Sequence, residues 1–211
     1  MPATDKLGWL PETPSQTAGP FVHIGLLPRQ AGFALFESDL GATLVTPATQ
    51  GSRISIEGRI LDGAGAPLRD AVVELWQADS HGRYPHPADH RPGPRDAAFR
   101  GWGRTCTDFA TGRFAFDTIK PGRVPGRAGQ PRMAPHVSLW IVARGFNLGL
   151  ATRLYFDDEA EANAEDPVLR QIEQPARRAT LIAARSTQGE HPCYTLDIHL
   201  QGERETVFFD I

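Results

Sequence analysis

The stretch RISIEGRIL, residues 53–61, decides the fold class. Ile54, Ile56, Gly58 and Ile60 stand at alternate positions, and polar residues occupy most of the positions between them. Successive side chains of a β-strand point to opposite faces, so this alternation predicts a half-buried strand. The turn-forming sequence DGAGAP, residues 62–67, then ends it.

Several other short apolar runs have strand character. They are AVVELWQA (71–78), TGRFAFDTI (111–119), HVSLWIVAR (136–144), LATRLYF (150–156) and CYTLDIHLQG (193–202). Helical spacing is confined to Val168, Leu169 and Ile172, which fit one short helix, and to PARRATLIAAR (175–185), which fits a second. We therefore expect an all-β fold: a β-sandwich with long loops, one or two short helices and an extended N-terminal arm.

Residues 1–50 have no sustained periodicity. Single large apolar residues alternate there with Pro, Gly and Thr, which makes the segment too hydrophobic for a disordered tail. We expect residues 1–50 to form an arm that packs on its own domain and on a partner chain. Residues 51–211 would then form the β-sandwich domain.

Charge and cysteine content exclude some classes of protein. Lys and Arg number 22 and Asp and Glu 25, so the net charge is −3 and no basic surface for nucleic acid is indicated. We find no apolar run long enough to cross a membrane and no typical export leader. Cys106 and Cys193 are far apart and form no CxxC motif. We expect a cytoplasmic protein with two free thiols, although a disulfide between them stays open.

The loop DSHGRYPHPADH, residues 79–90, raises the possibility of a metal site. His81, His86, His90 and Asp89 cluster in it, and such side chains can bind a divalent cation. Their spacing matches no common zinc template, and the loop is polar and rich in Pro. A solvated loop is the favoured interpretation.

A second set of residues occupies positions where a ferric ion could be bound. A ferric ion is a hard acid that two tyrosinates and two imidazoles hold well, and an H-x-H pair on one strand would place both imidazoles on one face. This chain has Tyr84 and His136, but Val124 has no donor atom and the hydroxyl of Ser138 is a poor neutral ligand. Two donors are too few to retain a ferric centre.

Four segments carry a specific resemblance. LRDAVVELWQADSHGRYPH (68–86), GWGRTCTDFATGRFAFDTIKPG (101–122), MAPHVSLWIVARG (133–145) and TRLYFDDE (152–159) resemble the intradiol ring-cleaving dioxygenases. The likeness extends over nearly all 211 residues. Catalytic chains of that family hold iron with Tyr, Tyr, His and His in G-x-Y, PG-x-Y-P and H-x-H contexts. Tyr84 and His136 match the first Tyr and the first His, whereas Val124 and Ser138 replace the other two ligands.

The resemblance implies the alpha chain of a two-chain enzyme, with no catalytic residue and no metal ligand of its own. A beta chain would hold the Fe3+, and the pair would cleave protocatechuate with O2 to 3-carboxy-cis,cis-muconate. By the same resemblance, Thr17, Gly19 and Pro20 of the arm lie over the beta-chain site.

Arg144 falls where the alpha chain supplies an arginine to the substrate region, and a guanidinium suits the carboxylate of protocatechuate. Trp76, Trp102 and Trp140 are expected in the core or in an interface. The alternative is a β-sandwich interaction module without catalysis, because a fold does not by itself imply a function.

Overall fold

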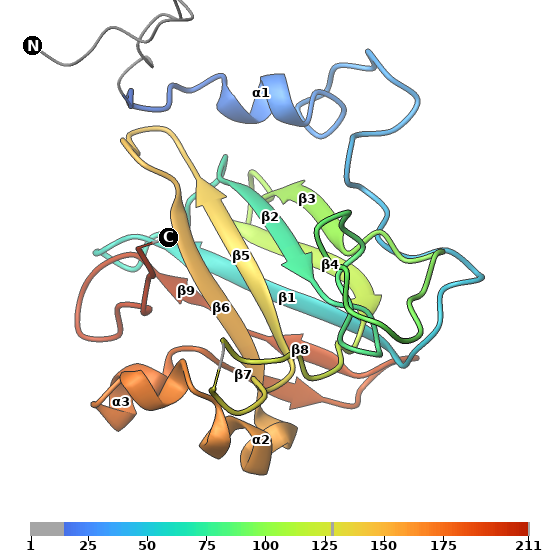
Figure 1. Cartoon of the computed structure of the whole chain (residues 1–211). Coiled ribbons are helices and arrows are strands. Elements are labelled where there is room, and N and C mark those ends of the chain that lie inside the picture. Colours follow the sequence, from blue (N-terminus) through green and yellow to red (C-terminus); the bar gives the residue numbers. More distant parts are fainter. Residues whose placement is uncertain (1–14, 128, 211) are drawn as a thin grey trace, which may run out of the picture.

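Strands dominate the computed structural model, which describes residues 15–127 and 129–210. The strands are β1 (Arg53–Leu61), β2 (Val72–Gln77), β3 (Trp102–Cys106), β4 (Arg113–Ile119), β5 (His136–Val142), β6 (Leu150–Phe156), β7 (Ile182–Ser186), β8 (Cys193–Thr195) and β9 (Ile198–His199). Their hydrogen-bonded order is β3-β2-β5-β6-β7-β8-β1-β4, with β9 beside β1 (Figure 1).

The continuous sheet folds over itself, and one core fills the space between its two halves. Val73 and Leu139 point inward from the β3-β2-β5-β6 half, and Ile56 and Phe116 do so from the half that contains β1 and β4. These side chains belong to one buried apolar cluster. The predicted all-β sandwich is confirmed.

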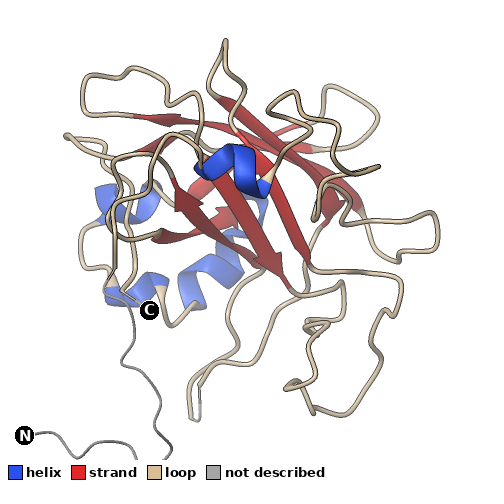
Figure 2. Ribbon diagram, turned by 90° about the horizontal axis from the view of Figure 1, so that it is seen from above, coloured by secondary structure: helices blue, strands red, loops and turns tan. Residues whose placement is uncertain are grey.

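Five short helical segments lie at the ends of the sandwich. The α-helices are α1 (Val22–Leu26), α2 (Ala160–Glu165) and α3 (Pro175–Ala179), and the 3-10 turns are Asp157–Glu159 and Leu169–Gln171. The helix α1 lies over one end of the strands, while α2 and α3 lie near the other end (Figures 1 and 2). The described residues thus contain more helical segments than the one or two expected.

The predicted helix over 175–185 is wrong in its second half. It ends at Ala179, and Ile182–Ser186 form β7, which runs parallel to β6 and antiparallel to β8. Backbone hydrogen bonds to two neighbouring strands override the local helical spacing. This strand is the link that joins the two halves of the sheet.

The predicted strand over 193–202 is interrupted. The strands β8 and β9 both run parallel to β1, and between them the Asp197 carboxylate accepts a hydrogen bond from the Arg59 backbone N–H at 3.0 Å. A Cβ on Gly58 would lie 2.0 Å from the Leu196 carbonyl oxygen. Gly58 therefore stands on the apolar face of RISIEGRIL because another backbone passes directly over it.

The described part of the arm packs on the sandwich. Ala18 exchanges backbone hydrogen bonds with the loop after β5, donating to Phe146 at 2.8 Å and accepting from Gly145 at 2.9 Å. Leu27 at the end of α1 is buried with Val72. Residues 1–14 of the expected arm lie outside the described residues, and the boundary at residue 50 stays a prediction.

Both cysteines are free thiols, so the disulfide left open by the sequence is absent. Within the described residues, no helix has the length and apolar character needed to span a membrane.

Candidate functional site

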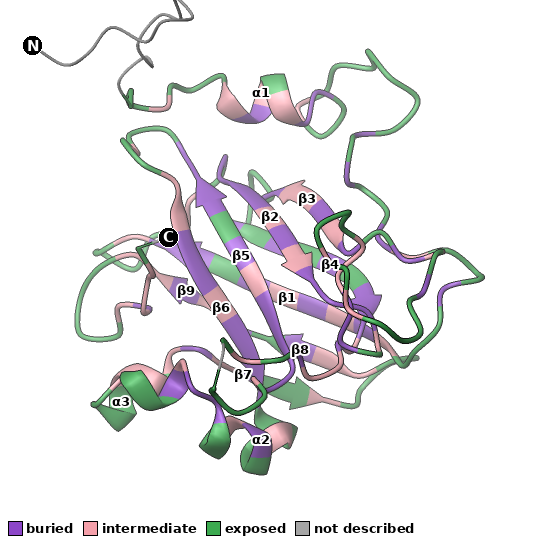
Figure 3. Cartoon of the chain, viewed as in Figure 1, coloured by how far each residue is buried: buried purple, intermediate pink, exposed green. Residues whose placement is uncertain are grey.

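The family's four iron positions come together at the start of β5. Ser138 pairs with Trp76 of β2 on one side and with Arg153 of β6 on the other. The ring of Tyr84 stacks on Trp76 with a centroid separation of 5.7 Å, and Tyr84 and Val124 line one cavity of about 460 Å³. His136 lies two residues from Ser138, so both side chains point to the outer face of β5; both ends of this strand are buried, and its middle is more exposed (Figure 3).

Close backbone packing holds the two loops that carry Tyr84 and Val124. Gly82 has a φ of 75°, and a Cβ there would lie 2.1 Å from the carbonyl oxygen of Arg123. A side chain at this position would meet both a strained conformation and a fixed backbone atom. The glycine of the G-x-Y context therefore positions Tyr84 beside the PG-x-V-P loop.

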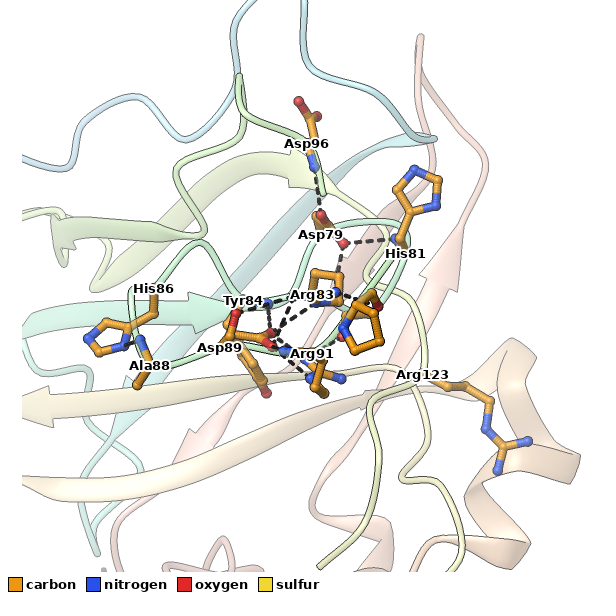
Figure 4. Close-up of polar contacts among 12 residues, drawn as sticks. Asp79, His81, Arg83, Tyr84, His86, Ala88, Asp89, Arg91, Asp96 and Arg123 are labelled. Carbon is orange, nitrogen blue, oxygen red and sulfur yellow. Dashed lines mark hydrogen bonds and ion pairs between the residues drawn. The ribbon is translucent and has the colours of Figure 1, made fainter. Parts of the chain in front are cut away.

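A buried carboxylate organises the loop around Tyr84 (Figure 4). The Asp89 side chain forms ion pairs with Arg83 and Arg91 and accepts a hydrogen bond from the Tyr84 backbone N–H at 2.9 Å. Hydrogen bonding from Arg91 holds the pKa of Asp89 well below its usual range. The Asp89 carboxylate is therefore already occupied by two arginine side chains and by the loop backbone.

The histidines of this loop do not converge on Asp89. The backbone N–H of His81 donates to Asp79, and the Nδ1 atom of His86 accepts from the Ala88 backbone N–H at 3.1 Å. Among the described residues, no group of three or more His, Cys, Asp or Glu is placed to hold a metal ion. The donor chemistry of this loop therefore favours a structural role.

The iron positions themselves do not fit a ferric ion. His136 is buried and its Nδ1–H donates to the Ala134 carbonyl oxygen at 2.8 Å, while burial raises the pKa of the Tyr84 phenol. Val124 is only 2% exposed and brings methyl groups to the cavity wall. One phenol, one imidazole and a neutral hydroxyl are a poor donor set for a trivalent cation.

Arg153, which no sequence pattern singled out, adds a positive charge beside the iron positions. Its Nη1 donates to the Tyr155 hydroxyl at 3.2 Å. Burial lowers the pKa of His136 and the charge of Arg153 lowers it further, whereas at Tyr84 the same charge only partly offsets the burial that raises the pKa of the phenol. A fixed cation disfavours a second cation nearby. The prediction that this chain holds no iron thus gains an electrostatic reason besides the missing ligands.

The imidazole of His136 should make stability depend on pH. Burial, assisted by the charge of Arg153, lowers its pKa from 6.5 to about 4. The unfolded chain therefore binds a proton at higher pH than the folded chain does, so stability is retained above pH 6.5 and falls as pH drops toward 4. The loss from this group should reach about 2 kcal/mol at pH 5 and about 3 kcal/mol below pH 4.

Urea unfolding at pH 7 and pH 5 checks this prediction. The His136→Asn variant keeps an N–H donor for Ala134 and removes the titrating group, so its stability should change less between the two pH values by about 2 kcal/mol. An equal pH dependence in both proteins would contradict the assignment.

The expected substrate-binding residues lie together, but at the other end of β5. The hydroxyl of Thr17 donates to the Asn147 side-chain oxygen, and the Arg144 guanidinium forms an ion pair with Asp70 at 2.9 Å. Eight residues separate His136 from Arg144, which corresponds to roughly 27 Å along an extended strand. Arg144 therefore cannot serve the iron positions of its own chain.

Both Arg144 and the Thr17–Pro20 segment are open to the outside. The Arg144 side chain is 60% exposed, and Thr17, Gly19 and Pro20 are exposed as well. A Cβ on Gly19 would meet nothing within 4 Å in this chain. The fold of this chain alone therefore does not require a glycine there.

The three described tryptophans were expected either in the core or in an interface. They are not in the core of the sandwich. Trp76, Trp102 and Trp140 stand on the outer face of the β3-β2-β5-β6 half and line a groove there. Their possible place in an interface stays a prediction.

Comparison with known proteins agrees with this fold. The family described as "Dioxygenase" matches residues 36–202. Solved structures show the same fold: an intradiol ring-cleavage dioxygenase from Tetranychus urticae superposes with a TM-score of 0.52 at 19% identity, covering 89% of this chain and 94% of that one. The chain belongs to the family of intradiol ring-cleaving dioxygenases.

Within the family, the similarity extends to particular chains. The protocatechuate 3,4-dioxygenase alpha chain of Pseudomonas putida is 49% identical over 201 residues, which cover 95% of this chain and 97% of that one. The protocatechuate 3,4-dioxygenase beta chain of Burkholderia cepacia is 36% identical over 160 residues, or 74% of this chain and 67% of that one.

Proposed function

We propose that this chain is the alpha subunit of a protocatechuate 3,4-dioxygenase and that a beta subunit holds the Fe3+. The observation that carries the proposal is the combination of 49% identity to an alpha chain with a donor set that two replacements and the Arg153 cation make unsuitable for iron. The iron of the partner would supply the activation of the catechol ring toward O2. This chain would complete the pocket around the ring.

The residues beyond the C-terminal end of β5 would be the ones that complete the partner's pocket. Thr17, Gly19 and Pro20 would cover the partner's substrate pocket, and the missing side chain of Gly19 would allow the arm backbone to approach a flat ring. The Arg144 guanidinium would pair with the carboxylate of protocatechuate. Their exposure in this chain, together with their distance from its own iron positions, supports a role at another chain's site.

Exposed apolar side chains support the presence of a partner. Residues of the arm leave large apolar side chains in solvent, with exposed fractions from 50% to 73%; they are Phe21, Phe33, Leu35, Phe36 and Leu40. Exposed apolar residues gathered in one segment mark an interaction surface. A beta chain that covers the arm would bury them.

We also propose a cytoplasmic location. Cys106 and Cys193 are both free thiols, which suits a reducing compartment. Protocatechuate, O2 and the beta chain are the partners that this function requires.

Co-expression tests the proposal. We expect iron colour and protocatechuate-dependent O2 uptake when this chain is purified together with a beta chain, and neither property in this chain alone. The beta chain alone serves as the control for what this chain adds. Stoichiometric iron and turnover in the single chain would contradict the proposal, and failure to form any complex would favour an interaction module with other partners.

A further inference from the structure

A tight turn after β5 fixes the backbone of Arg144. The Phe146 backbone N–H donates to the Ala143 carbonyl oxygen at 3.1 Å, and Gly145 has a φ of 87°. A four-residue turn closed in this way, with a positive φ at its third residue, has the form of a type II turn and favours glycine there. Arg144 is the second residue of this turn. Its backbone is therefore held in place even though its side chain is 60% exposed.

The same turn holds the N-terminal arm (Figure 1). Ala18 exchanges two backbone hydrogen bonds with it, accepting from Gly145 at 2.9 Å and donating to Phe146 at 2.8 Å. Beside them, the Thr17 hydroxyl donates to the Oδ1 atom of Asn147. Phe146 packs against the core of the sandwich, which anchors the turn. The arm and the Arg144 backbone therefore share one support.

The contact with Asn147 limits what the Thr17 hydroxyl can do. A threonine hydroxyl has one proton to donate and two lone pairs that accept. Because the proton is directed at the Asn147 side-chain oxygen, Thr17 can only accept a hydrogen bond from a ligand. Asn147 is exposed, so its contribution to the stability of the sandwich should be small. The effect of the contact is local, because it fixes the arm on the turn.

We propose that Asn147 is a positioning residue for the two-chain reaction. By accepting from Thr17 it keeps the arm segment 17–20 and Arg144 in one fixed arrangement, so that both reach the partner's substrate pocket together. This inference rests on the proposed function, because Asn147 acts through residues that would contact substrate only at the partner's site. An arm that is arranged in advance loses less conformational freedom when the pocket closes on the substrate.

Kinetics of the two-chain complex test the role of Asn147. We expect Asn147→Ala and Thr17→Val each to lower kcat/KM for protocatechuate about 3- to 10-fold, which corresponds to the loss of one hydrogen bond. The double variant should lose no more than either single variant, because all three lack the same hydrogen bond. Thr17→Ser keeps the hydroxyl, and its kcat/KM should remain within about twofold of the parent value.

Hydrogen exchange of the same complex gives a readout that does not need turnover. The Ala18 backbone N–H, which donates to Phe146, should exchange at least about threefold faster in Asn147→Ala, because the arm opens more often. The control variant Gln188→Ala removes an exposed amide side chain from the loop between β7 and β8. It should match the parent in both measurements.

The outcomes separate this inference from the proposed function. Losses in kcat/KM that multiply in the double variant would overturn the role of Asn147. Unchanged exchange at Ala18 in an active complex, or faster exchange without a loss in kcat/KM, would overturn it as well. A parent complex that cleaves no protocatechuate would overturn the proposed function and this inference together.

Discussion

A variant that carries Val124→Tyr, Ser138→His and Arg153→Gln is expected to bind ferric iron in a one-to-one ratio, whereas the unchanged chain should retain none. The first two substitutions restore the second phenolate and the second imidazole at positions where the fold already gathers Tyr84 and His136. Two tyrosinates and two histidines match the preference of a hard trivalent cation.

The third substitution is needed because Arg153 opposes any added cation. It stands on β6 directly opposite Ser138, and after burial its charge is the next largest cause of the lowered pKa of His136. Glutamine removes this charge and keeps an N–H donor for the Tyr155 hydroxyl. A double variant that retains Arg153 should bind iron at least about tenfold more weakly, because like charges repel strongly where water is scarce.

The cavity beside Val124 makes the larger tyrosine acceptable. Val124 lines a space of about 460 Å³, so a phenol ring can enter the cavity without displacing the core. The measurement is the visible tyrosinate-to-iron absorption band together with the metal content of the purified protein. Val124→Phe, Ser138→Asn and Arg153→Gln in combination form a control with similar bulk and no added ligands. A folded triple variant without the band would show that backbone geometry, rather than donor identity, prevents binding.

The positions of this site could be predicted from the sequence because they depend on local patterns. Alternation in 53–61 and 136–144 predicts strands whose faces are fixed by the period of two, so His136 and Ser138 share a face wherever the strand lies. The G-x-Y and PG-x-V-P contexts then place Tyr84 and Val124 in adjacent loops, since Gly82 lets the two backbones touch.

The role of Arg153 could not be predicted in the same way, because it depends on strand register. A shift of β6 by one residue would turn Arg153 to the core side of the sheet, and the five-residue link GFNLG leaves that register open. The error at 182–186 has a related cause: local spacing favoured a helix, whereas pairing with β6 and β8 imposes a strand. Long-range pairing decided both features.

Replacement of Arg144 by Ala in the two-chain complex is expected to lower kcat/KM for protocatechuate about 10- to 150-fold, mainly through KM. A hydrogen-bonded pair that involves a charged group contributes about 1.5 to 3 kcal/mol, which corresponds to this range. The kcat/KM of the Arg144→Lys variant should lie between those of the parent and of Arg144→Ala. An ammonium keeps the charge but loses the two-pronged geometry of the guanidinium.

The ion pair with Asp70 provides a second, opposite test of the same assignment. Asp70 is buried and lies 2.9 Å from the Arg144 guanidinium, so it competes with a substrate carboxylate for that charge. Asp70→Asn removes the competitor and should lower KM for protocatechuate. Catechol, which has no carboxylate, provides the matched substrate control, and its kinetics should respond little to either substitution. If Arg144→Ala reduced turnover of catechol and protocatechuate equally, Arg144 would be a structural residue of the interface, because only a direct contact with the carboxylate distinguishes the two substrates.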